Sequence, residues 1–375
     1  MNAVALIPST PAPHGRPTIR VGIIGTGQFA QACHIPGVKS HPAAEIVAVC
    51  GRRLDSTREL AARFDIPQVY TDYRDLCRDP DVDAVSIVTP NLWHREQAVL
   101  ALEHGKHVLC EKPLGITVSD AEQMLAAARA SGRVHMVAFT YRYCYGVQQL
   151  RREVQAGTIG EPYLLRVNYD SWEGLNPAWE IGWRENQQLA GGGVLFDRGA
   201  HLFDLARFVL GPIDFVSGFS HHIARQQPLA GAPLSIGSVE TDDVAAAWFR
   251  HARGTHGQWS ASRASAPFAP NSFVQVVGPR GALQAAVSRG SVDSLHHSVP
   301  PSAAWNELPL PAAAADKTPH ALVRMMHSFV DACLRGAPDR EVDATFDDGL
   351  AVQRALDGVV RSTSAPEWVD LRPGG

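Results

Sequence analysis

The chain has 375 residues, of which 45% are hydrophobic and 19% are charged, and its formal net charge at pH 7 is −4. This length favours two domains over one compact core, and this composition is typical of a soluble globular protein. The small negative charge gives no electrostatic basis for binding nucleic acid, and no apolar run approaches the roughly 18 residues that a membrane span needs.

Residues 1–17 contain four prolines and show neither a helical nor a strand-like pattern. They also lack the charged start and the long apolar segment of a secretory signal. We therefore expect a disordered tail, with the folded chain beginning at residue 18.

Six cysteines are scattered along the chain, and no two of them have the CxxC spacing. Several stand in apolar, strand-like runs, where cysteine behaves as a small hydrophobic residue. This use of cysteine is typical of a reducing compartment, so we expect a cytoplasmic protein.

Short apolar runs alternate with helical patterns as far as about residue 140. The expected strands are residues 19–24, 46–50, 84–88, 108–110 and 134–138. The clearest helix is expected to begin at Ser119, with Glu122 completing a capping box, and to end at Gly132. This alternation predicts a doubly wound parallel sheet, that is, an N-terminal Rossmann domain over residues 18–140.

The pattern changes after Tyr141. A helix is expected over residues 146–156, and later strands are expected over residues 163–169, 244–249, 257–261 and 273–277. Because no long helices separate these strands, they predict a second α/β domain, residues 141–375, with a large, open and mostly antiparallel sheet. Two late helices are expected over residues 322–333 and 350–360, and loops over the Ala-Pro-rich stretches 226–233 and 298–315.

A glycine-rich turn follows the first expected strand. It comprises Gly25, Thr26, Gly27, Gln28, Phe29 and Ala30. In a dinucleotide-binding turn the first glycine allows a tight bend, the second lets the backbone approach the pyrophosphate, and the last position needs only a small residue. A GxGxxA sequence between a strand and a helix therefore predicts a site for a nicotinamide dinucleotide.

The second expected strand ends in Cys50 and Gly51, followed by Arg52 and Arg53. The acidic residue that commonly binds the adenosine ribose is absent there, and arginines at this place can bind a 2′-phosphate. The alternative is that both arginines are solvated and that NAD binds without a carboxylate. The cofactor is thus expected to be NADP or NAD, and the arginines favour NADP.

Lysine is rare in this chain, which contains four lysines and thirty arginines. Lys112 follows an apolar run, in the sequence Glu111-Lys112-Pro113, where a parallel strand is expected to end. Lysine can lose its proton near neutral pH when it is desolvated, whereas arginine cannot. We therefore interpret Lys112 as a proton-transfer group, the alternative being an ordinary surface lysine.

A second candidate group begins after the glycines at residues 191–193. Asp197 and His201 precede apolar residues at helical spacing, which end at Gly211. If the helix includes Asp197, the two side chains are i, i+4 neighbours, and the pair suits a general base because a carboxylate holds the histidine tautomer. The glycines would let a cofactor or substrate approach the backbone. The alternative is an ordinary helix-surface contact.

Together these motifs resemble those of the glucose-fructose oxidoreductase / inositol dehydrogenase / MocA family, from about Thr18 to Leu371. The matching pieces are Gly25 to Ala30, Thr89-Pro90-Asn91-Leu92-Trp93-His94, Glu111-Lys112-Pro113, Gly157 to Pro162, Trp183-Arg184, Gly191 to Asp204, Asp348-Gly349-Leu350 and Val359 to Ser362. The family fold joins an N-terminal Rossmann domain to an α/β domain with a large open sheet. The resemblance also implies that this sheet pairs subunits into a homodimer or homotetramer.

The resemblance implies roles for individual positions. Lys112 and His201 would lie near the reacting carbon, with Asp197 beside them, and Pro113 would follow a cis peptide bond. The residues expected to bind the cofactor are Gly25, Thr26, Gly27, Gln28, Phe29, Ala30, Arg52, Arg53, Thr89, Pro90, Asn91, His94, Glu111, Lys112, Trp183 and Arg184. Those expected to contact the substrate are Lys112, Asn168, Asp170, Trp183, Asp197 and His201.

Three further expectations concern neighbouring residues. Asn168, Tyr169 and Asp170 end a strand that leads toward Trp172, Trp179 and Trp183, and are therefore candidate substrate contacts. These tryptophans could form a wall for stacking sugars, the alternatives being core packing or an interface. Arg198 replaces an apolar residue that is more usual in the family, and it is expected either to reach an anionic group or to be solvated. No metal site is expected, because the paired histidines at 221–222 and 296–297 have no cysteine or carboxylate at ligand spacing.

The activity that the resemblance implies is NAD(P)-dependent hydride transfer between a nicotinamide and a hydroxyl or carbonyl carbon of a sugar, glycoside or cyclitol. Lys112 and His201 would be its acid and base. Two other classes stay open: an NAD-dependent glycosidase that works through a transient keto-sugar, and a non-catalytic cofactor-binding sensor. A sensor has no need of Lys112, Asp197 and His201 together, which favours an enzyme.

Overall fold

The computed structural model describes residues 18–265, 272–287, 293–314 and 320–372, so the expected tail at 1–17 lies outside the described residues. The described chain forms two compact units. The first comprises residues 18–140 and 320–350, and the second comprises the rest. The first segment of this unit ends at Thr140, and residues 320–350, which the sequence analysis groups with residues 141–375, cluster with that segment.

The first unit is built on a six-stranded parallel sheet with the strand order β3-β2-β1-β4-β5-β6. Its strands are β1 (Ile19–Ile24), β2 (Ala44–Cys50), β3 (Gln68–Tyr70), β4 (Ala84–Ile87), β5 (His107–Cys110) and β6 (His135–Val137). This is the strand order of dinucleotide-binding Rossmann folds, so the predicted fold class is confirmed. The carboxyl ends of β1, β2, β4 and β5 meet at one edge of the sheet.

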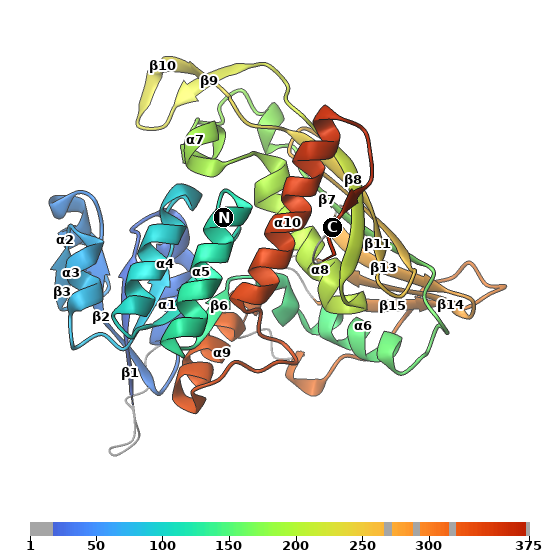
Figure 1. Cartoon of the computed structure of the whole chain (residues 1–375), viewed down its shortest axis with the longest axis horizontal. Coiled ribbons are helices and arrows are strands. Elements are labelled where there is room, and N and C mark those ends of the chain that lie inside the picture. Colours follow the sequence, from blue (N-terminus) through green and yellow to red (C-terminus); the bar gives the residue numbers. More distant parts are fainter. Residues whose placement is uncertain (1–17, 266–271, 288–292, 315–319, 373–375) are drawn as a thin grey trace. The chain divides into compact units, whose positions relative to one another are not determined.

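Helices connect and cover these strands (Figure 1). They are η1 (Ala30–His34), α1 (Ile35–Lys39), α2 (Leu54–Arg63), α3 (Tyr73–Arg78), η2 (Asn91–Trp93), α4 (His94–Glu103), α5 (Val118–Ser131) and α9 (Ala321–Arg335). The capping box of α5 joins Thr117 and Asp120 and not Ser119 and Glu122, because Thr117 has the extended backbone of a cap residue. Gly132 ends α5 in the left-handed conformation, as expected.

The apolar face of α9 explains why this helix belongs to the first unit. Met325, Met326 and Phe329 are fully buried, and α9 packs on α1, η1 and β1. A Cβ added to Gly37 of α1 would lie 2.6 Å from the Cγ of Met326, so the two helices are in close contact. Burying each of these large side chains stabilises the unit by about 1.5–3 kcal/mol.

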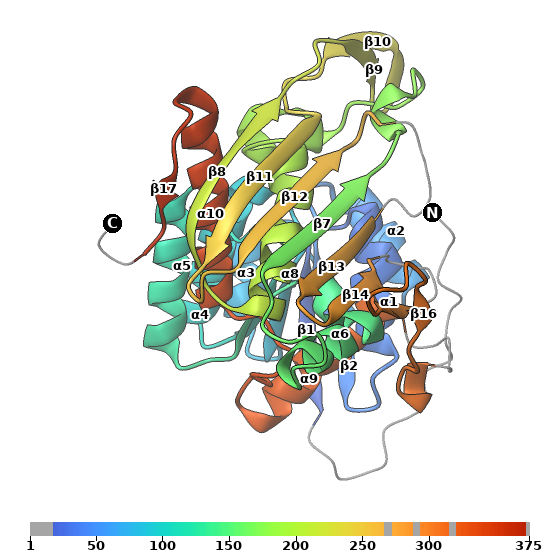
Figure 2. The ribbon, with the colours of Figure 1, turned by 90° about the vertical axis from the view of Figure 1, so that its right-hand side faces the viewer.

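The second unit is built on a nine-stranded sheet with the order β16-β15-β14-β13-β7-β12-β11-β8-β17 (Figure 2). Its strands are β7 (Leu164–Asp170), β8 (Ile213–His221), β11 (Val244–His251), β12 (His256–Ser262), β13 (Ser272–Gly278), β14 (Gly281–Ala286), β15 (Leu295–Ser298), β16 (Asn306–Glu307) and β17 (Val369–Asp370). Neighbours are antiparallel except β7 and β12, which are parallel. The predicted mostly antiparallel sheet is therefore confirmed.

One face of this sheet forms the core of the second unit. Side chains alternate along each strand, so that Val167, Phe249 and Trp259 are buried while their neighbours face outward. Phe203 of α8 packs on Phe249 and Trp259 with ring centroids 5.8 and 5.2 Å apart. The helices of the unit are α6 (Tyr145–Gln155), α7 (Gln187–Ala190), α8 (Ala200–Leu210) and most of α10 (Phe346–Ser364), with short turns η3 (Thr140–Tyr143), η4 (Glu173–Leu175), η5 (Trp183–Glu185), η6 (Leu195–Gly199) and η7 (Ala312–Ala314).

A hairpin replaces the first expected loop. β9 (Gln226–Leu229) and β10 (Ala232–Ser238) pair antiparallel and form a separate two-stranded sheet (Figure 1). The stretch was interpreted as a loop because of its Ala-Pro content, but Pro is tolerated in an edge strand and Gly231 takes the positive φ of 76° that the turn needs.

All six cysteines are buried and none of them forms a disulfide bond. Within the described ranges, every helix is too short or too polar to cross a membrane.

Candidate functional site

The glycine turn has the geometry of a dinucleotide-binding turn. Gly25 has a φ of 115°, and a Cβ at this position would lie 2.6 Å from the carbonyl oxygen of Val88. By contrast, a Cβ on Gly27 would meet no protein atom within 4 Å. The first glycine is therefore required by the fold itself, whereas the second leaves open space that a ligand can approach.

The turn leads into a helix that starts at Gln28 and Phe29 and continues as η1, a single turn of π-helix. Ala30 is fully buried at its start, Gln28 is exposed, and Thr26 and Phe29 are half-buried. Single π-helical turns are frequently found at functional sites. Here the π-turn directs His34 into the core, where its side chain is fully buried.

Arg52 and Arg53 follow β2 and are both exposed. Arg53 is the N-cap residue of α2, and its carbonyl oxygen accepts a hydrogen bond of 2.6 Å from the hydroxyl of Thr57. In the part of the chain that the structure describes, neither guanidinium forms an ion pair. Both are thus available to an anionic group.

Thr89, Pro90 and Asn91 follow β4 at the same edge of the sheet. The hydroxyl of Thr89 donates to Gln97 at 2.6 Å. His94 is fully buried behind this loop, with Nδ1 2.9 Å from the carbonyl oxygen of Pro113 and Nε2 3.0 Å from that of Thr89. Burial lowers the pKa of His94. His94 therefore holds the two loops together and does not stand in their solvent-facing surface.

Glu111 and Lys112 continue directly from β5. Both are buried, each with 8% of its surface exposed, and the peptide bond from Lys112 to Pro113 is cis. The carboxylate of Glu111 lies 3.0 Å from Nε2 of His34, whose Nδ1 lies 2.7 Å from the hydroxyl oxygen of Ser86. Its other oxygen accepts the backbone N–H of Lys112 at 3.2 Å. Lys112 is therefore buried near the end of β5, a position in which a lysine can act as a proton-transfer group.

In the second unit, Asp197 lies in the π-helical turn η6 and His201 in the first turn of α8. Asp197 is half-buried and His201 is buried. The ring of His201 lies against that of Tyr141, with centroids 4.6 Å apart, and Tyr141 in turn lies 6.1 Å from Tyr169. The structure therefore places His201 in an aromatic environment.

Asp204 has a different role from Asp197. It is 1% exposed, and its carboxylate accepts hydrogen bonds of 2.6 to 3.0 Å from the guanidinium of Arg142. This buried ion pair joins α8 to the segment before α6.

The turn with Trp183 and Arg184 lies beside Asp197. The guanidinium of Arg184 stacks over the ring of Trp183 at 4.5 Å and lies 3.8 Å from the carboxylate of Asp197. The Arg184 side chain is nearly half exposed, so Trp183, Arg184 and Asp197 form an accessible group.

Asn168 and Asp170 are not brought to this group. On β7 the residues that face α8 are Leu165, Val167 and Tyr169, and a strand points alternate side chains to opposite faces. Asn168 donates to Asp170 at 3.0 Å on the other face of the sheet. Tyr169, which lies between them, is on the same side of the sheet as Tyr141.

Arg198 reaches an anionic group, the carboxylate of Glu173, and is not solvated. It is buried, it donates to Ser171, Glu173 and the carbonyl oxygen of Ser262, and it stacks over Tyr169 at 4.8 Å. It therefore anchors the 171–173 segment and is not available to a ligand.

Gly192 and Gly193 pack against the protein itself. A Cβ on Gly192 would meet the ring of Phe196, and one on Gly193 would lie 2.7 Å from the backbone nitrogen of Asp242. The carboxylate of Asp242 accepts the N–H groups of Gly193 at 2.6 Å and Leu195 at 2.7 Å. Burial raises the pKa of this carboxyl, and the two hydrogen bonds oppose that rise. The glycines thus allow Asp242 to hold the start of the helix that carries Asp197 and His201.

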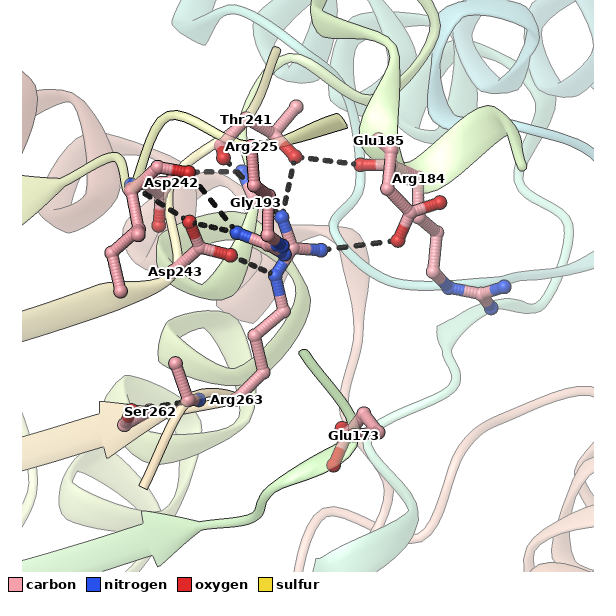
Figure 3. A network of polar contacts seen from close by, with 12 residues as sticks. Glu173, Arg184, Glu185, Gly193, Arg225, Thr241, Asp242, Asp243, Ser262 and Arg263 are labelled. Carbon is pink, nitrogen blue, oxygen red and sulfur yellow. Dashed lines mark hydrogen bonds and ion pairs between the residues drawn. The ribbon is translucent and has the colours of Figure 1, made fainter. Parts of the chain in front are cut away.

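A buried network lies next to this contact (Figure 3). Arg263 donates to Asp243 at 2.6 Å, to Glu185 at 3.1 Å and to the hydroxyl of Thr241 at 3.0 Å, and Arg225 pairs with Asp243 at 2.6 Å. Burial would raise the pKa of Asp243, but the hydrogen bonds from the two arginines outweigh it and hold the pKa below its usual value. The network fixes Glu185, the residue after Arg184, to the strands of the large sheet.

Sequence reasoning missed His34, Ser86, Tyr141 and Asp242. None belongs to a short motif, although His34 stands nine residues after Gly25 in the same turn-helix segment. Within the described residues, no three histidine, cysteine or carboxylate side chains are grouped as metal ligands.

Two family models match the chain. The model of the oxidoreductase family with an NAD-binding Rossmann fold matches residues 19–139. The model of the GFO/IDH/MocA C-terminal domain matches residues 147–284. The first match covers the segment that forms the six-stranded sheet, and the second covers most of the segment that forms the nine-stranded sheet.

The chain is also similar to curated proteins and solved structures that are named as sugar dehydrogenases. Levoglucosan dehydrogenase of Pseudarthrobacter phenanthrenivorans is 27% identical over 390 residues, covering 94% of this chain and 98% of that protein. D-glucoside 3-dehydrogenase of Escherichia coli is 38% identical over 193 residues, covering 52% of this chain and 54% of that protein. A structure of levoglucosan dehydrogenase in complex with NADH has a TM-score of 0.85 at 26% identity, covering 95% of this chain and 99% of that chain.

Proposed function

This chain belongs to the GFO/IDH/MocA family of NAD-binding oxidoreductases, and we propose that it transfers hydride between a nicotinamide and a hydroxyl or carbonyl carbon of a sugar, glycoside or cyclitol. The observation that carries the proposal is the likeness to levoglucosan dehydrogenase over nearly the whole of both chains. Further named relatives, a D-glucoside 3-dehydrogenase and a myo-inositol 2-dehydrogenase, support the substrate class.

The first unit fits a nicotinamide dinucleotide. The open space at Gly27 would admit the pyrophosphate, and the exposed Arg52 and Arg53 would face the adenosine ribose. Thr89, Pro90 and Glu111 follow strands that end at the same edge and would line the rest of the site. Bound NAD or NADP would supply the hydride acceptor or donor. NAD is supported by the matched family model, and NADP only by the two arginines.

Lys112 and His201 are the proposed acid and base. Lys112 is buried at the end of β5, where its amine can hold or release a proton, and His201 is buried against Tyr141. Asp197 would orient the substrate and polarise its hydroxyl group, since its carboxylate is half-buried beside Arg184. General acid–base help of this kind is typically worth about 10²–10⁴-fold in rate. Trp183 is the proposed apolar contact of the sugar ring.

The test is a panel of levoglucosan, methyl β-D-glucoside, myo-inositol and free aldoses with NAD and with NADP. Formation of the reduced cofactor is followed by its absorbance. Steady reduction by one of these compounds supports the proposal. Glycoside cleavage without net reduction would identify the hydrolytic alternative, and cofactor binding without either reaction would identify a sensor.

We further propose that the outer face of the nine-stranded sheet joins copies of this chain into a homodimer or homotetramer. Trp248 and Phe219 are exposed on neighbouring strands of that face, with 52% and 42% of their surfaces accessible. Exposed aromatic groups of this kind are typical of protein interfaces. Sedimentation of the protein and of a Trp248→Glu variant tests this: the variant should sediment as a smaller species. A cytoplasmic location, supported by six buried cysteines that form no disulfide bond, is part of the same proposal.

A further inference from the structure

Three polar side chains meet in the core of the first unit. Nδ1 of His34 lies 2.7 Å from the hydroxyl oxygen of Ser86, and Nε2 of His34 lies 3.0 Å from the carboxylate of Glu111. His34 and Ser86 are fully buried and Glu111 is 8% exposed. The remaining residues of β4, Ala84, Val85 and Ile87, are apolar and fully buried, so Ser86 stands alone in that strand.

The three side chains come from distant parts of the sequence. His34 ends the π-helical turn η1, Ser86 lies within β4, and Glu111 follows β5. Their separations are 52 and 77 residues. Burying such groups costs free energy that apolar side chains of similar size would not cost. A network of this kind rigidifies its surroundings when its members are hydrogen-bonded.

In one arrangement of protons, both ring nitrogens of a neutral His34 are hydrogen-bonded. The hydroxyl of Ser86 donates to Nδ1 of His34, and Nε2–H of His34 donates to the carboxylate of Glu111. In this arrangement Ser86 selects the tautomer of His34, and His34 directs its N–H at one oxygen of Glu111.

The network reaches Lys112 through the other oxygen of the same carboxylate. Oε2 of Glu111 accepts the backbone N–H of Lys112 at 3.2 Å. Each oxygen of Glu111 is therefore held by a different group, one by His34 and the other by the peptide that carries Lys112. A carboxylate held at both oxygens has a fixed rotamer, and it fixes the orientation of that peptide.

We propose that His34 is a positioning residue for Lys112, acting through Glu111, with Ser86 setting its tautomer. The inference rests on the proposed function, in which Lys112 transfers the proton. It predicts an effect on the chemical step that exceeds any effect on cofactor binding, because a displacement of about 1 Å in a catalytic group can cost ~10²-fold in rate.

The test compares His34→Leu and His34→Gln with the unchanged enzyme. The sugar that reduces the cofactor fastest in the panel is the substrate, and NADH is the binding probe. His34→Leu should lower kcat by about 10- to 100-fold while KM and the Kd for NADH stay within about threefold. His34→Gln, which keeps a donor and an acceptor, should recover a large part of kcat. Glu111→Gln should lower kcat as well, and Ser86→Ala should do so less.

His107→Gln is the matched control. His107 is the first residue of β5, at the opposite end of the strand from Lys112, and its Nδ1 accepts the N–H of Val134 at 3.0 Å. This variant should lose thermal stability without losing kcat. A purely structural role of His34 would give the same result as His107→Gln.

Each outcome decides between distinct ideas. A normal kcat in a folded His34→Leu, or an equal loss in His34→Leu and His34→Gln, would overturn the positioning role. If His34→Leu does not fold, the kcat of Glu111→Gln decides instead, and an unchanged value would count against the inference. Lys112→Arg measures the proposed function separately: normal turnover there removes the basis of both, whereas loss there with a normal His34→Leu removes only this inference.

Discussion

Gly193 lies so close to Asp242 that position 193 has no room for a side chain: a Cβ there would lie 2.7 Å from the backbone nitrogen of Asp242. We predict that Gly193→Ala lowers the free energy of unfolding by about 1–3 kcal/mol, the usual cost of overpacking. It should also lower kcat, because the displaced segment begins the helix of Asp197 and His201. Chemical denaturation and steady-state kinetics measure the two effects. Gly182→Ala is the control, since a Cβ at residue 182 meets only the end of Glu185 at 3.7 Å.

Gly27→Val should abolish binding of NADH and leave the fold intact. The space at Gly27 is free of protein atoms within 4 Å, so the valine would occupy only the volume proposed for the pyrophosphate. Calorimetric titration with NADH is the measurement. Unchanged affinity in a folded Gly27→Val would sink the proposed site. Gly25→Ala should behave differently and lose stability, because Gly25 has a φ of 115° and contacts Val88.

The two arginines after β2 make a prediction about cofactor choice. NADP should bind at least as tightly as NAD, because Arg52 and Arg53 are exposed and can pair with a 2′-phosphate. Arg52→Ala should then reduce the preference for NADP without altering the Kd for NAD. If NAD binds much more tightly and Arg52→Ala leaves the ratio unchanged, these arginines are only solvated.

Replacing the proposed acid and base should separate chemistry from binding. Lys112→Arg keeps a positive charge but removes a group that can lose its proton, so kcat should fall by about 10²–10⁴-fold. His201→Asn should have a similar effect, and Asp197→Asn a smaller one, because Asp197 orients and does not transfer the proton. The Kd for NADH should change little in all three. Near-normal turnover of Lys112→Arg at saturating substrate would contradict the mechanism.

Acid should destabilise the second unit through His251. Burial lowers the pKa of His251 to about 4, although the carbonyl oxygens of Gly211 and Pro212 partly oppose it. The unfolded chain takes up the proton near pH ~6.5 and the folded one does not, so stability is complete above that pH and falls as pH drops toward 4. The loss should reach about 3 kcal/mol.

Denaturation at several pH values measures this loss. In His251→Gln the pH dependence between about 4 and 6.5 should be flatter by that amount. The exposed His222, changed to Gln, serves as the control and should leave the profile as it is. An equal slope in the protein and in His251→Gln would show that other groups cause the acid sensitivity.

Periodicity predicted the strands of the first unit except one. β3 is three residues long and lies at the sheet edge, so its side chains show no pattern that could be recognised. The hairpin β9–β10 was missed for a different reason. Its Ala-Pro composition is typical of loops, and only pairing with a neighbouring strand makes it extended.

The residues of the candidate site also fall into those that local sequence pattern predicts and those that it does not. Gly25, Gly27 and Lys112 could be proposed from the sequence because each closely follows an apolar run that predicts a strand. Ser86 and Glu111 lie 52 and 77 residues after His34, and no local pattern relates the three residues. The glycines at 191–193 were assigned to a ligand because a sequence does not show that Asp242 packs against Gly193.

The first unit is discontinuous in sequence, and this has a consequence for its synthesis. Its strands are complete by residue 140, but the helix α9 that covers η1 and α1 is supplied only by the segment ending at residue 350. At about 5–20 residues per second, the ribosome needs on the order of 10–40 seconds to make the roughly 210 residues between these points. Throughout that interval the nascent cofactor-binding unit exposes the apolar surface that Met325, Met326 and Phe329 later bury. A fragment ending at residue 140 should therefore bind chaperones or aggregate, and exchange of this unit between relatives must carry both of its segments.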